Sequence, residues 1–363
     1  MRIALLAPLR HPIKPPFMGG LEAHCWHLAR GLKARGHQVT LFASGDSDVG
    51  VPVFPVLRRH ARADFPDPAR QGGAHLAAIL DAAMQRACDR IAQGGFDVVH
   101  DASQHPRPLA LAARGQPCVT ALHGPPAPAL QRATLDQPGA RFTLPSEHQR
   151  RVWWPGAAPA RVAVVHPGID PGRWPFSPLG NGTLVWSGRM RPEKGPQLAA
   201  QTAARLGMPL TLYGMVEHRA WFDGAVRPFL GGRIRYGGHL GQDDLARALG
   251  AASVLLFTPV GDEPFGRAAV EAMATGLPVA SFDQGAAREV IGDAGAFAGD
   301  PLPQALAPAI RQALAIPRDR PRNRVERLFT LSGMLQGYEA QYRAAIADRA
   351  GAAPPSRAEP PLP

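Results

Sequence analysis

Residues 262–279 read Asp-Glu-Pro-Phe-Gly-Arg-Ala-Ala-Val-Glu-Ala-Met-Ala-Thr-Gly-Leu-Pro-Val, and this stretch carries the strongest indication of the fold class. The apolar run 252–258 before it predicts a buried strand that ends by Pro264. A helix over 265–275 and a second strand over 277–282 follow. A strand, a helix and another strand in this order indicate an α/β fold with a parallel sheet.

Two glutamates in this stretch predict a ligand site. Glu263 stands just before the helix start, and Glu271 stands two turns along it. The helix N-terminus suits a phosphate, and a carboxylate can accept hydrogen bonds from both hydroxyls of a ribose. Such crevices lie at the carboxyl ends of strands. Two simpler interpretations stay open: Glu263 could only stabilise the helix dipole, and Glu271 could only pair with Arg267.

The stretch resembles the Glu-x7-Glu signature of retaining GT-B glycosyltransferases, family 4 in particular. The resemblance includes Pro-Phe-Gly after Glu263, Ala-Met-Ala after Glu271 and Gly-x-Pro-Val at the next strand. It implies that Glu263 faces the donor sugar and that Glu271 binds the ribose. It also implies that backbone N–H groups of Phe265, Gly266 and Arg267 hold phosphate and sugar oxygens.

Residues 187–195 contain Gly-Arg-x-x-x-x-Lys-Gly, which resembles the motif whose cations neutralise the donor diphosphate in this family. Arg189 and Lys194 occupy the two cationic positions. Breaking a sugar–phosphate bond leaves a diphosphate with rising negative charge, so two cations there stabilise the transition state most. The simpler interpretation is a solvated loop that begins a helix.

Five further positions follow from the resemblance. Gly19 and Gly20 match a loop whose backbone approaches the diphosphate, and glycine permits such an approach. His123 ends a predicted strand and matches a histidine that contacts the transferred sugar, although a lone histidine is more often structural. His239 and Leu240 mark the expected place of the nucleobase. His100 and His166 also lie near strand ends and are left as structural candidates.

The alternation of predicted strands and helices begins twice, which indicates two Rossmann-like domains. The resemblance implies the GT-B arrangement, with the domains facing across a cleft. We expect a first, acceptor-side domain over 1–167 and a nucleotide-sugar-binding domain over 168–321. A helix over 322–347 should cross back to the first domain, and 348–363 should form a disordered tail. Residues 51–70 show no clear period and predict a loop.

Composition bounds the remaining possibilities. The net charge is +11, but 37 of the 40 cationic residues are scattered arginines, without the aromatic–basic interleaving typical of nucleic-acid binding. The charge also allows attraction to an anionic membrane surface or substrate. The sequence has no run of eighteen apolar residues and no signal-peptide pattern, so we expect a cytoplasmic protein. Peripheral contact with the inner face of the membrane is left open as an alternative. Three cysteines without metal or disulfide spacing predict buried apolar side chains: Cys25, Cys88 and Cys118.

The sequence thus predicts a retaining glycosyltransferase that moves a sugar from a nucleoside diphosphate donor, UDP- or GDP-linked, to a glycan, lipid-linked or small-molecule acceptor. No cofactor and no essential metal are expected, because Arg189, Lys194 and the helix end offset the diphosphate charge. A dinucleotide-dependent oxidoreductase would need Gly-x-Gly-x-x-Gly after the first strand, and residues 7–20 lack it. Two alternatives remain: a nucleotide-sugar epimerase of the same fold, and a non-catalytic nucleotide-sugar-binding protein. The acceptor, the donor sugar and the oligomeric state are left open.

Overall fold

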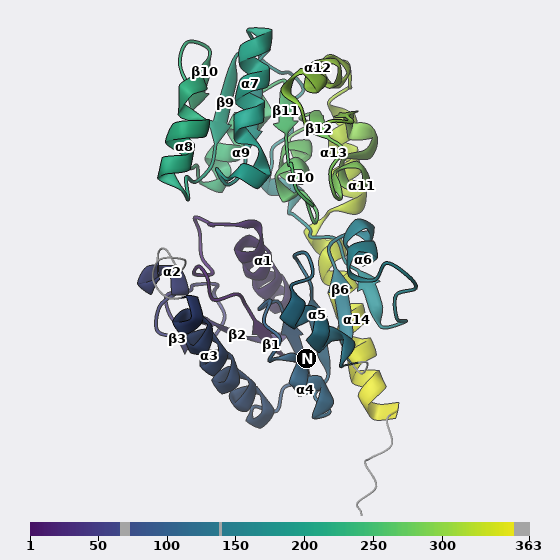
Figure 1. Cartoon of the computed structure of the whole chain (residues 1–363). Helices are drawn as coiled ribbons and strands as arrows, with labels where there is room; N and C mark the ends of the chain where they lie inside the picture. The colour runs from purple at the N-terminus through teal and green to yellow at the C-terminus, as the bar shows by residue number, and fades with distance from the viewer. Residues whose placement is uncertain (66–72, 138–139, 352–363) are drawn as a thin grey trace, which may run out of the picture.

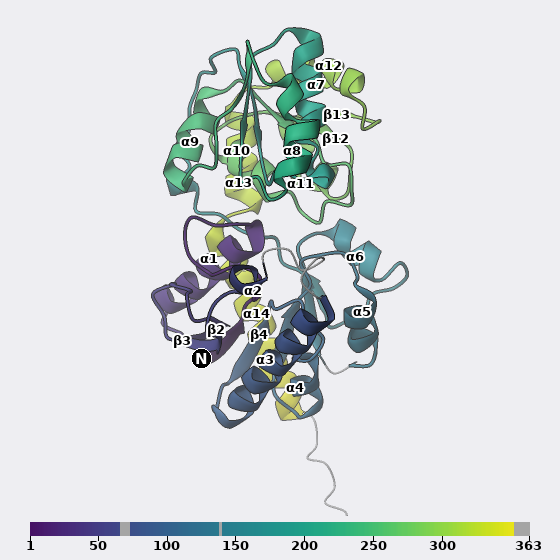
Figure 2. The ribbon, with the colours of Figure 1, turned by 60° about the vertical axis from the view of Figure 1, so that its left-hand side comes forward.

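The computed structural model describes residues 1–65, 73–137 and 140–351. They form two units, each built on one parallel sheet, with helices packed on both faces (Figure 1). This confirms the predicted fold class, two Rossmann-like parallel-sheet domains. The view turned by 60° shows the two units stacked end to end, with the loops of one facing the loops of the other (Figure 2).

The first sheet has the strand order β3-β2-β1-β4-β5-β6-β7, and every neighbouring pair is parallel. Its strands are β1 Arg2–Leu6, β2 Gln38–Ser44, β3 Val53–Leu57, β4 Val98–Asp101, β5 Cys118–Ala121, β6 Arg141–Leu144 and β7 Val162–Val164. Its helices are α1 Gly20–Ala34, α2 Ala61–Asp64, α3 Gly73–Gln93, α4 Leu109–Ala113, α5 Pro128–Leu135 and α6 Glu147–Trp153.

The second sheet has the order β10-β9-β8-β11-β12-β13, again all parallel. Its strands are β8 Leu184–Ser187, β9 Leu210–Tyr213, β10 Ile234–Tyr236, β11 Val254–Phe257, β12 Val279–Phe282 and β13 Gly295–Ala298. Its α-helices are α7 Pro196–Leu206, α8 Arg219–Ala225, α9 Gln242–Ala251, α10 Arg267–Ala274, α11 Ala287–Ile291 and α12 Leu306–Leu314.

Each sheet is apolar on both faces, as parallel sheets covered by helices require. In the first sheet, alternate residues of β1 separate into two cores: Ile3 and Leu5 pack with α1, and Ala4 and Leu6 pack with α3. In the second, Leu255 of β11 packs with α9 and α10, whereas Val254 and Leu256 belong to the opposite core with α7 and α12. The three cysteines are buried and free, as expected.

The helix expected over 322–347 is two helices, α13 Asp319–Leu328 and α14 Leu331–Gly351. The chain breaks at Phe329 and Thr330 because Phe329 is buried and Thr330 Oγ1 accepts a hydrogen bond from Gly333 N at the start of α14. α14 runs back along the first sheet and buries two tyrosines in its core (Figure 1). Of the predicted disordered tail, residues 348–351 are helical, and 352–363 lie outside the described residues.

The prediction of a loop over 51–70 is wrong in its first part. β3 adds a parallel edge strand beside β2, with Leu41 opposite Val53, and α2 follows. Pro55 argued against a strand in the sequence, because proline has no N–H to donate to a sheet. At an edge the missing donor costs nothing, so the strand forms. Residues 66–70 lie outside the described part of the chain.

Several arginines of the second unit bind backbone oxygens rather than solvent anions. Arg318 donates to the carbonyls of Ser177, Gly250 and Ala252 at 2.7–2.9 Å. Arg324 likewise donates to Val290 O at 2.8 Å. Part of the basic charge is thus structural. Among the described residues, none of the helices combines the length and apolar character that a membrane crossing requires.

Candidate functional site

The predicted site lies where the order of the second sheet reverses. β8 and β11 are neighbours, and the chain leaves them toward opposite sides of the sheet: β9 beside β8, and β12 beside β11. A crevice forms at the carboxyl ends of strands at such a point, and ligands bind there in open α/β sheets. The loop after β8 carries Arg189 and Lys194, and the loop after β11 carries Glu263. The topology therefore brings both predicted motifs together.

Lys194 and Glu263 form an ion pair in this crevice. Lys194 Nζ donates to Glu263 Oε2 at 2.5 Å, and the Glu263 side chain is only 8% exposed. The lysine loop is held by Thr258, whose hydroxyl donates to Gly195 O at 2.8 Å and accepts from Trp186 Nε1 at 3.0 Å. A Cβ at Gly195 would meet Thr258 O at 2.0 Å, so this close contact requires glycine.

The Glu263 loop is fixed from behind and leads into α10. Ala286 N donates to Glu263 O at 2.8 Å. Gly266 has φ +94° and turns the chain, so that α10 begins at Arg267, two residues later than the expected start at 265. Phe265 is buried between His166 and Phe329. Glu263 consequently lies beside the N-terminus of α10, with its side chain turned to Lys194.

Arg189 points to a carboxylate that the sequence analysis missed. Arg189 Nη1 lies 3.4 Å from Glu217 Oε1, and Arg191 Nη1 lies 3.0 Å from Glu217 Oε2. Arg10 of the β1–α1 loop reaches Glu217 from the first unit at 3.3 Å. Burial alone would raise the pKa of Glu217, but Arg189, Arg10 and Arg191 lower it below its ordinary value. No motif marks Glu217 in the sequence.

Glu271 forms the ion pair that the simpler interpretation foresaw. Arg267 Nε donates to Glu271 Oε1 at 2.7 Å, and both side chains are about one-sixth exposed or less. Burial raises the pKa of Glu271, and Arg267 opposes this shift. This bond engages one of the two carboxylate oxygens of Glu271. Arg267 also lies against Gly20, where a Cβ would come within 3.5 Å of its Cδ.

Gly19 and Gly20 stand at the start of α1, opposite α10. Gly19 is the N-cap of α1 in an extended conformation. Its Cα faces the buried carboxylate of Glu22, because a Cβ there would lie 2.7 Å from Glu22 Oε2. Burial raises the pKa of Glu22, while Arg189 and Arg10 lower it. Glu22 is the last residue of the Gly-Gly-x-Glu pattern, so it could have been named as a site residue from the sequence.

His123 follows β5 and is oriented by Gln104. His123 N donates to Gln104 Oε1 at 3.2 Å, and Gln104 Nε2 donates to Ala121 O at 2.8 Å. Gln104 has φ +60°, a left-handed backbone that a non-glycine residue rarely adopts. The His123 ring meets that of His24 edge-on at 4.5 Å. Burial lowers the pKa of His123 to about 4, so its imidazole is neutral at physiological pH.

The remaining candidates differ in their surroundings. His239 is exposed and Leu240 half-buried, in the loop between β10 and α9. His100 is buried and bonds Tyr342 Oη at 2.9 Å through Nδ1, and His166 bonds Pro145 O at 2.9 Å. His100 and His166 thus have structural partners, as expected for the structural candidates of the sequence analysis.

The N-terminus of α6 ties the first unit to the Glu263 loop. Ser146 Oγ donates to Pro264 O at 2.7 Å, and Gln149 Nε2 donates to Asp262 Oδ2 at 2.7 Å. His148 Nε2 contacts the other oxygen of Asp262. These partners flank Glu263 on both sides in the chain. Residues of the first unit therefore help to set the position of a second-unit carboxylate.

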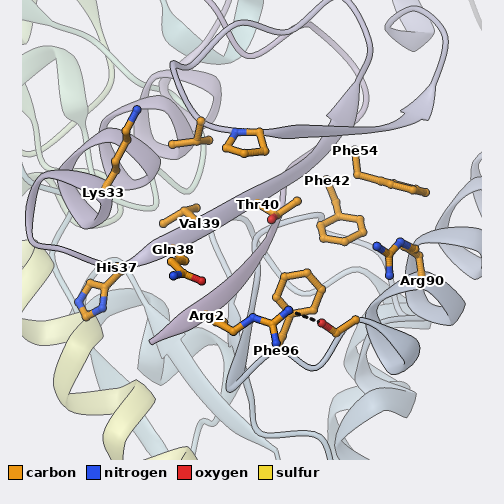
Figure 3. A pocket seen from close by; sticks show the side chains of 13 residues that line it. Arg2, Lys33, His37, Gln38, Val39, Thr40, Phe42, Phe54, Arg90 and Phe96 are labelled. Atoms are coloured by element: carbon orange, nitrogen blue, oxygen red, sulfur yellow. Dashed lines mark hydrogen bonds between the residues drawn. The ribbon is translucent and has the colours of Figure 1, made fainter.

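A hollow of about 490 Å³ lies away from this site (Figure 3). Arg2 and Gln38 begin β1 and β2, so the hollow opens at the amino ends of the strands, opposite the cleft. The chain also contains one Asp-x-Asp sequence, Asp46-Ser47-Asp48. Asp46 accepts hydrogen bonds from His60 there, and it lies outside the crevice between β8 and β11.

The comparisons with known proteins agree with this geometry. The profile of Glycosyltransferase Family 4 matches residues 18–173, and that of Glycosyl transferases group 1 matches residues 181–315. The chain belongs to glycosyltransferase family 4. Among curated relatives of this glycosyltransferase, glycogen synthase of Mycobacterium tuberculosis (strain CDC 1551 / Oshkosh) is 27% identical over 365 residues, 87% of each chain. Phosphatidyl-myo-inositol mannosyltransferase of Mycolicibacterium smegmatis is 26% identical, over 81% of this chain and 80% of that one.

Solved structures share the fold of the enzyme. AviGT4, a glycosyltransferase involved in avilamycin A biosynthesis, matches with a TM-score of 0.67 and 23% identity over 97% of this chain and 98% of that one. HepE of Anabaena, solved with UDP and glucose, matches with a TM-score of 0.71 and 18% identity over 95% of this chain and 100% of that one. Both support a GT-B arrangement.

Proposed function

We propose that this glycosyltransferase transfers a sugar from a nucleoside diphosphate sugar to an acceptor with retention of the anomeric configuration. The observation that carries the proposal is the ion pair of Lys194 and Glu263 beside the N-terminus of α10, where the strand order of the sheet reverses, with Arg189 in the same loop as Lys194. Such a place offers a helix end and two cations to a diphosphate.

In the proposed reaction, Lys194 and Arg189 stabilise the diphosphate as it leaves. The bond between the anomeric carbon and the phosphate oxygen breaks, and the acceptor oxygen bonds to that carbon from the same face. The acceptor proton passes to the departing phosphate oxygen. Fixed charges at the leaving group act most strongly in the transition state, where its negative charge is greatest. Glu263 orients Lys194 through their ion pair and faces the donor sugar.

The nucleoside half of the donor is assigned to α10 and the β10–α9 loop. Glu271 accepts hydrogen bonds from the ribose hydroxyls through the oxygen that Arg267 leaves open. The backbone of Phe265, Gly266 and Arg267 holds phosphate and sugar oxygens, and the nucleobase lies near His239 and Leu240. Gly19 and Gly20 bring the first unit's backbone to the diphosphate, and His123 contacts the transferred sugar as a neutral imidazole.

The names of relatives support a nucleotide donor and leave the acceptor open. HepE was solved with UDP-glucose, and curated relatives are named for glycogen synthesis and for mannosyl transfer to phosphatidyl-myo-inositol. We therefore propose a UDP- or GDP-sugar donor and a glycan, a lipid-linked or a small-molecule acceptor. Neither a divalent metal nor another cofactor is required, because Arg189, Lys194 and the α10 N-terminus offset the diphosphate charge.

A screen of nucleotide sugars tests this function. The enzyme is incubated with UDP-, GDP- and ADP-sugars, with and without an acceptor panel, and release of nucleoside diphosphate is measured. Transfer or slow hydrolysis of one donor supports the proposal, and NMR of the anomeric proton must show the donor's own configuration. An inverted product overturns retention. A changed sugar without acceptor indicates the epimerase, and binding without turnover indicates a non-catalytic protein. Loss of activity with EDTA, restored by Mg²⁺, overturns metal independence.

A further inference from the structure

A cluster of cationic side chains meets around Glu217 where the two units face each other. We call it the Glu217 cluster: Arg10, His11, Arg189, Arg191 and Glu217. Arg10 and Arg191 share one oxygen of Glu217, at 3.3 and 3.0 Å, and Arg189 takes the other at 3.4 Å. Glu217 is 8% exposed, so its carboxylate is enclosed by these groups. Both units contribute to the cluster, since Arg10 comes from the first unit and the other two arginines come from the second.

The cluster holds more positive than negative charge. Within the cluster three guanidinium groups face the single carboxylate of Glu217. Two further carboxylates lie at its edge: Glu193, 2.6 Å from Arg191, and Glu22, whose pKa burial raises and Arg189 and Arg10 lower. Desolvation lowers the pKa of Arg10, Glu217 raises it, and the neighbouring arginines Arg62, Arg189 and Arg191 lower it further. Like charges held this close repel in a partly desolvated place. An added anion would relieve this repulsion.

Three buried nitrogens of the cluster have no hydrogen-bond partner within the described residues: Arg10 Nε, His11 Nε2 and Arg191 Nε. The last of these forms an ion pair with Glu193 Oε1 at 2.6 Å, so Arg10 Nε and His11 Nε2 are the donors of interest. His11 is 7% exposed, and burial together with Arg10 lowers its pKa to about 4, so it is a neutral imidazole that can donate from Nε2. Buried donors are nearly always hydrogen-bonded in folded proteins. Their neighbourhood thus fits a ligand that carries several acceptor oxygens.

We propose that Arg10 and His11 bind a phosphate group carried by the acceptor, which makes this enzyme a glycosyltransferase of phosphorylated acceptors. A phosphate monoester has three acceptor oxygens and a charge of about −1.5 to −2 at pH 7, which suits two separate donors in a positively charged cluster. The proposal rests on the proposed function, in which Arg189 and Lys194 hold the donor diphosphate and the first unit holds the acceptor. Glu217 pairs with Arg189 through one oxygen and with Arg10 through the other, and we assign the two arginines to different phosphates.

The first experiment measures binding of inorganic phosphate to enzyme saturated with UDP, so that the donor site is already filled. In isothermal titration calorimetry, Arg10→Gln should weaken phosphate binding at least about tenfold, the loss typical of a charge-assisted hydrogen bond. Arg114→Gln is the matched control, because Arg114 is an exposed arginine at the end of α4 in the same unit. Its phosphate affinity and that of wild type should agree within a factor of about two.

A second variant has the opposite expected sign. Glu217→Gln removes the competing negative charge, so phosphate should bind more tightly, by roughly threefold or more. General damage to the fold would weaken binding instead. The proposal is overturned if phosphate fails to bind UDP-saturated wild type at tens of millimolar, or if Arg10→Gln leaves its affinity unchanged. It is also overturned if Arg10→Gln weakens UDP itself tenfold, since the arginine then serves the donor.

A third arm uses the donor found by the nucleotide-sugar screen and compares each hexose and cyclitol with its monophosphate as acceptor. Transfer to the phosphorylated member should exceed transfer to the plain one at least tenfold in kcat/KM, and Arg10→Gln should remove this preference. Equal rates for both members overturn the proposal. Failure of the proposed function looks different, because wild type would then bind no nucleoside diphosphate and turn over no donor.

Discussion

Gln149 of the first unit donates a hydrogen bond from Nε2 to Asp262 Oδ2 of the second unit, over 2.7 Å. Asp262 immediately precedes Glu263, so this bond connects domain packing to the proposed donor site. The N-terminus of the same helix is held by a second carboxylate, because Glu147 N and His148 N donate to the two oxygens of Glu289 at 2.8 and 2.9 Å. The packing of the two units and the placement of the Glu263 loop are therefore linked through one short helix.

Gln149→Glu should disturb this coupling, because it sets two carboxylates against each other. We expect kcat to fall roughly tenfold, and small-angle scattering should show a more open molecule. Asp262→Asn in the same chain should restore activity, since the amide introduced at position 262 can donate to the new carboxylate. Rescue by the double variant distinguishes this pair from a general loss of packing. If Gln149→Glu alone keeps full activity, the bond has no role in placing Glu263.

The proposed diphosphate contacts predict a large loss of turnover. Lys194→Ala and Arg189→Ala should each lower turnover by roughly 10²–10³-fold, which is the usual effect of removing a fixed charge that contacts a leaving group. Arg219→Ala is the control, because Arg219 is exposed and pairs with nearby Asp223 on α8. Steady-state kinetics with circular dichroism separates lost chemistry from lost fold. Turnover within a factor of about two of wild type in either variant would contradict the assignment.

Buried histidines of the first unit predict sensitivity to mild acid. Burial lowers the pKa of His100 to about 3 and that of His123 to about 4, and it lowers the pKa of His24 as well. The unfolded chain binds protons near pH 6.5, whereas the folded chain does not, so stability is lost as pH falls. His11 and His27 are buried in the same way, with pKa values lowered to about 4 and about 3, so between pH 7.5 and 6 the five groups together cost about 4 kcal/mol. Asp101 opposes this below pH 6, because burial raises its pKa to about 6.

The measurement is the melting temperature of the enzyme as a function of pH. Wild type should lose roughly 10 °C between pH 7.5 and 6, since about 1 kcal/mol shifts a domain of this size by roughly 2–4 °C. His100→Gln should make the loss smaller by about a fifth, whatever its effect at pH 7.5. His218→Gln should not, because His218 is exposed. Equal pH slopes in wild type and His100→Gln would refute this origin.

The second unit could be predicted well because its motifs sit on regular elements. Residues 252–258 contain a buried strand, and Gly266 with Gly276 bounds the signature helix, so β11, α10 and β12 follow from apolar runs and turn residues. The motif spacing then indicated which loops carry Lys194 and Glu263. Their ion pair needed the strand order, which the sequence does not state.

Contacts between distant segments could not be predicted. Glu217 lies in an ordinary loop after β9, and its importance arises only because three arginines from two units converge on it. Gln104 likewise looks unremarkable in sequence, yet its left-handed backbone and three hydrogen bonds orient His123. The break between α13 and α14 was missed because Phe329 and Thr330 fit a helical pattern until tertiary burial of Phe329 is known.

Substitution of Glu271 distinguishes a role in nucleotide binding from a purely structural ion pair with Arg267. Glu271→Gln replaces one acceptor oxygen with a donor amide, so it should weaken the nucleoside diphosphate that wild type binds by about tenfold, and Glu271→Ala should weaken it further. Burial raises the pKa of Glu271, so wild-type affinity should also fall as pH drops toward that raised pKa and the carboxylate gains a proton. Calorimetry with UDP, GDP and ADP at pH 7.5 and 5.5 measures both effects. A structural pair predicts another outcome: Glu271→Ala and Arg267→Ala would lower the melting temperature alike, and nucleotide affinity would stay that of wild type.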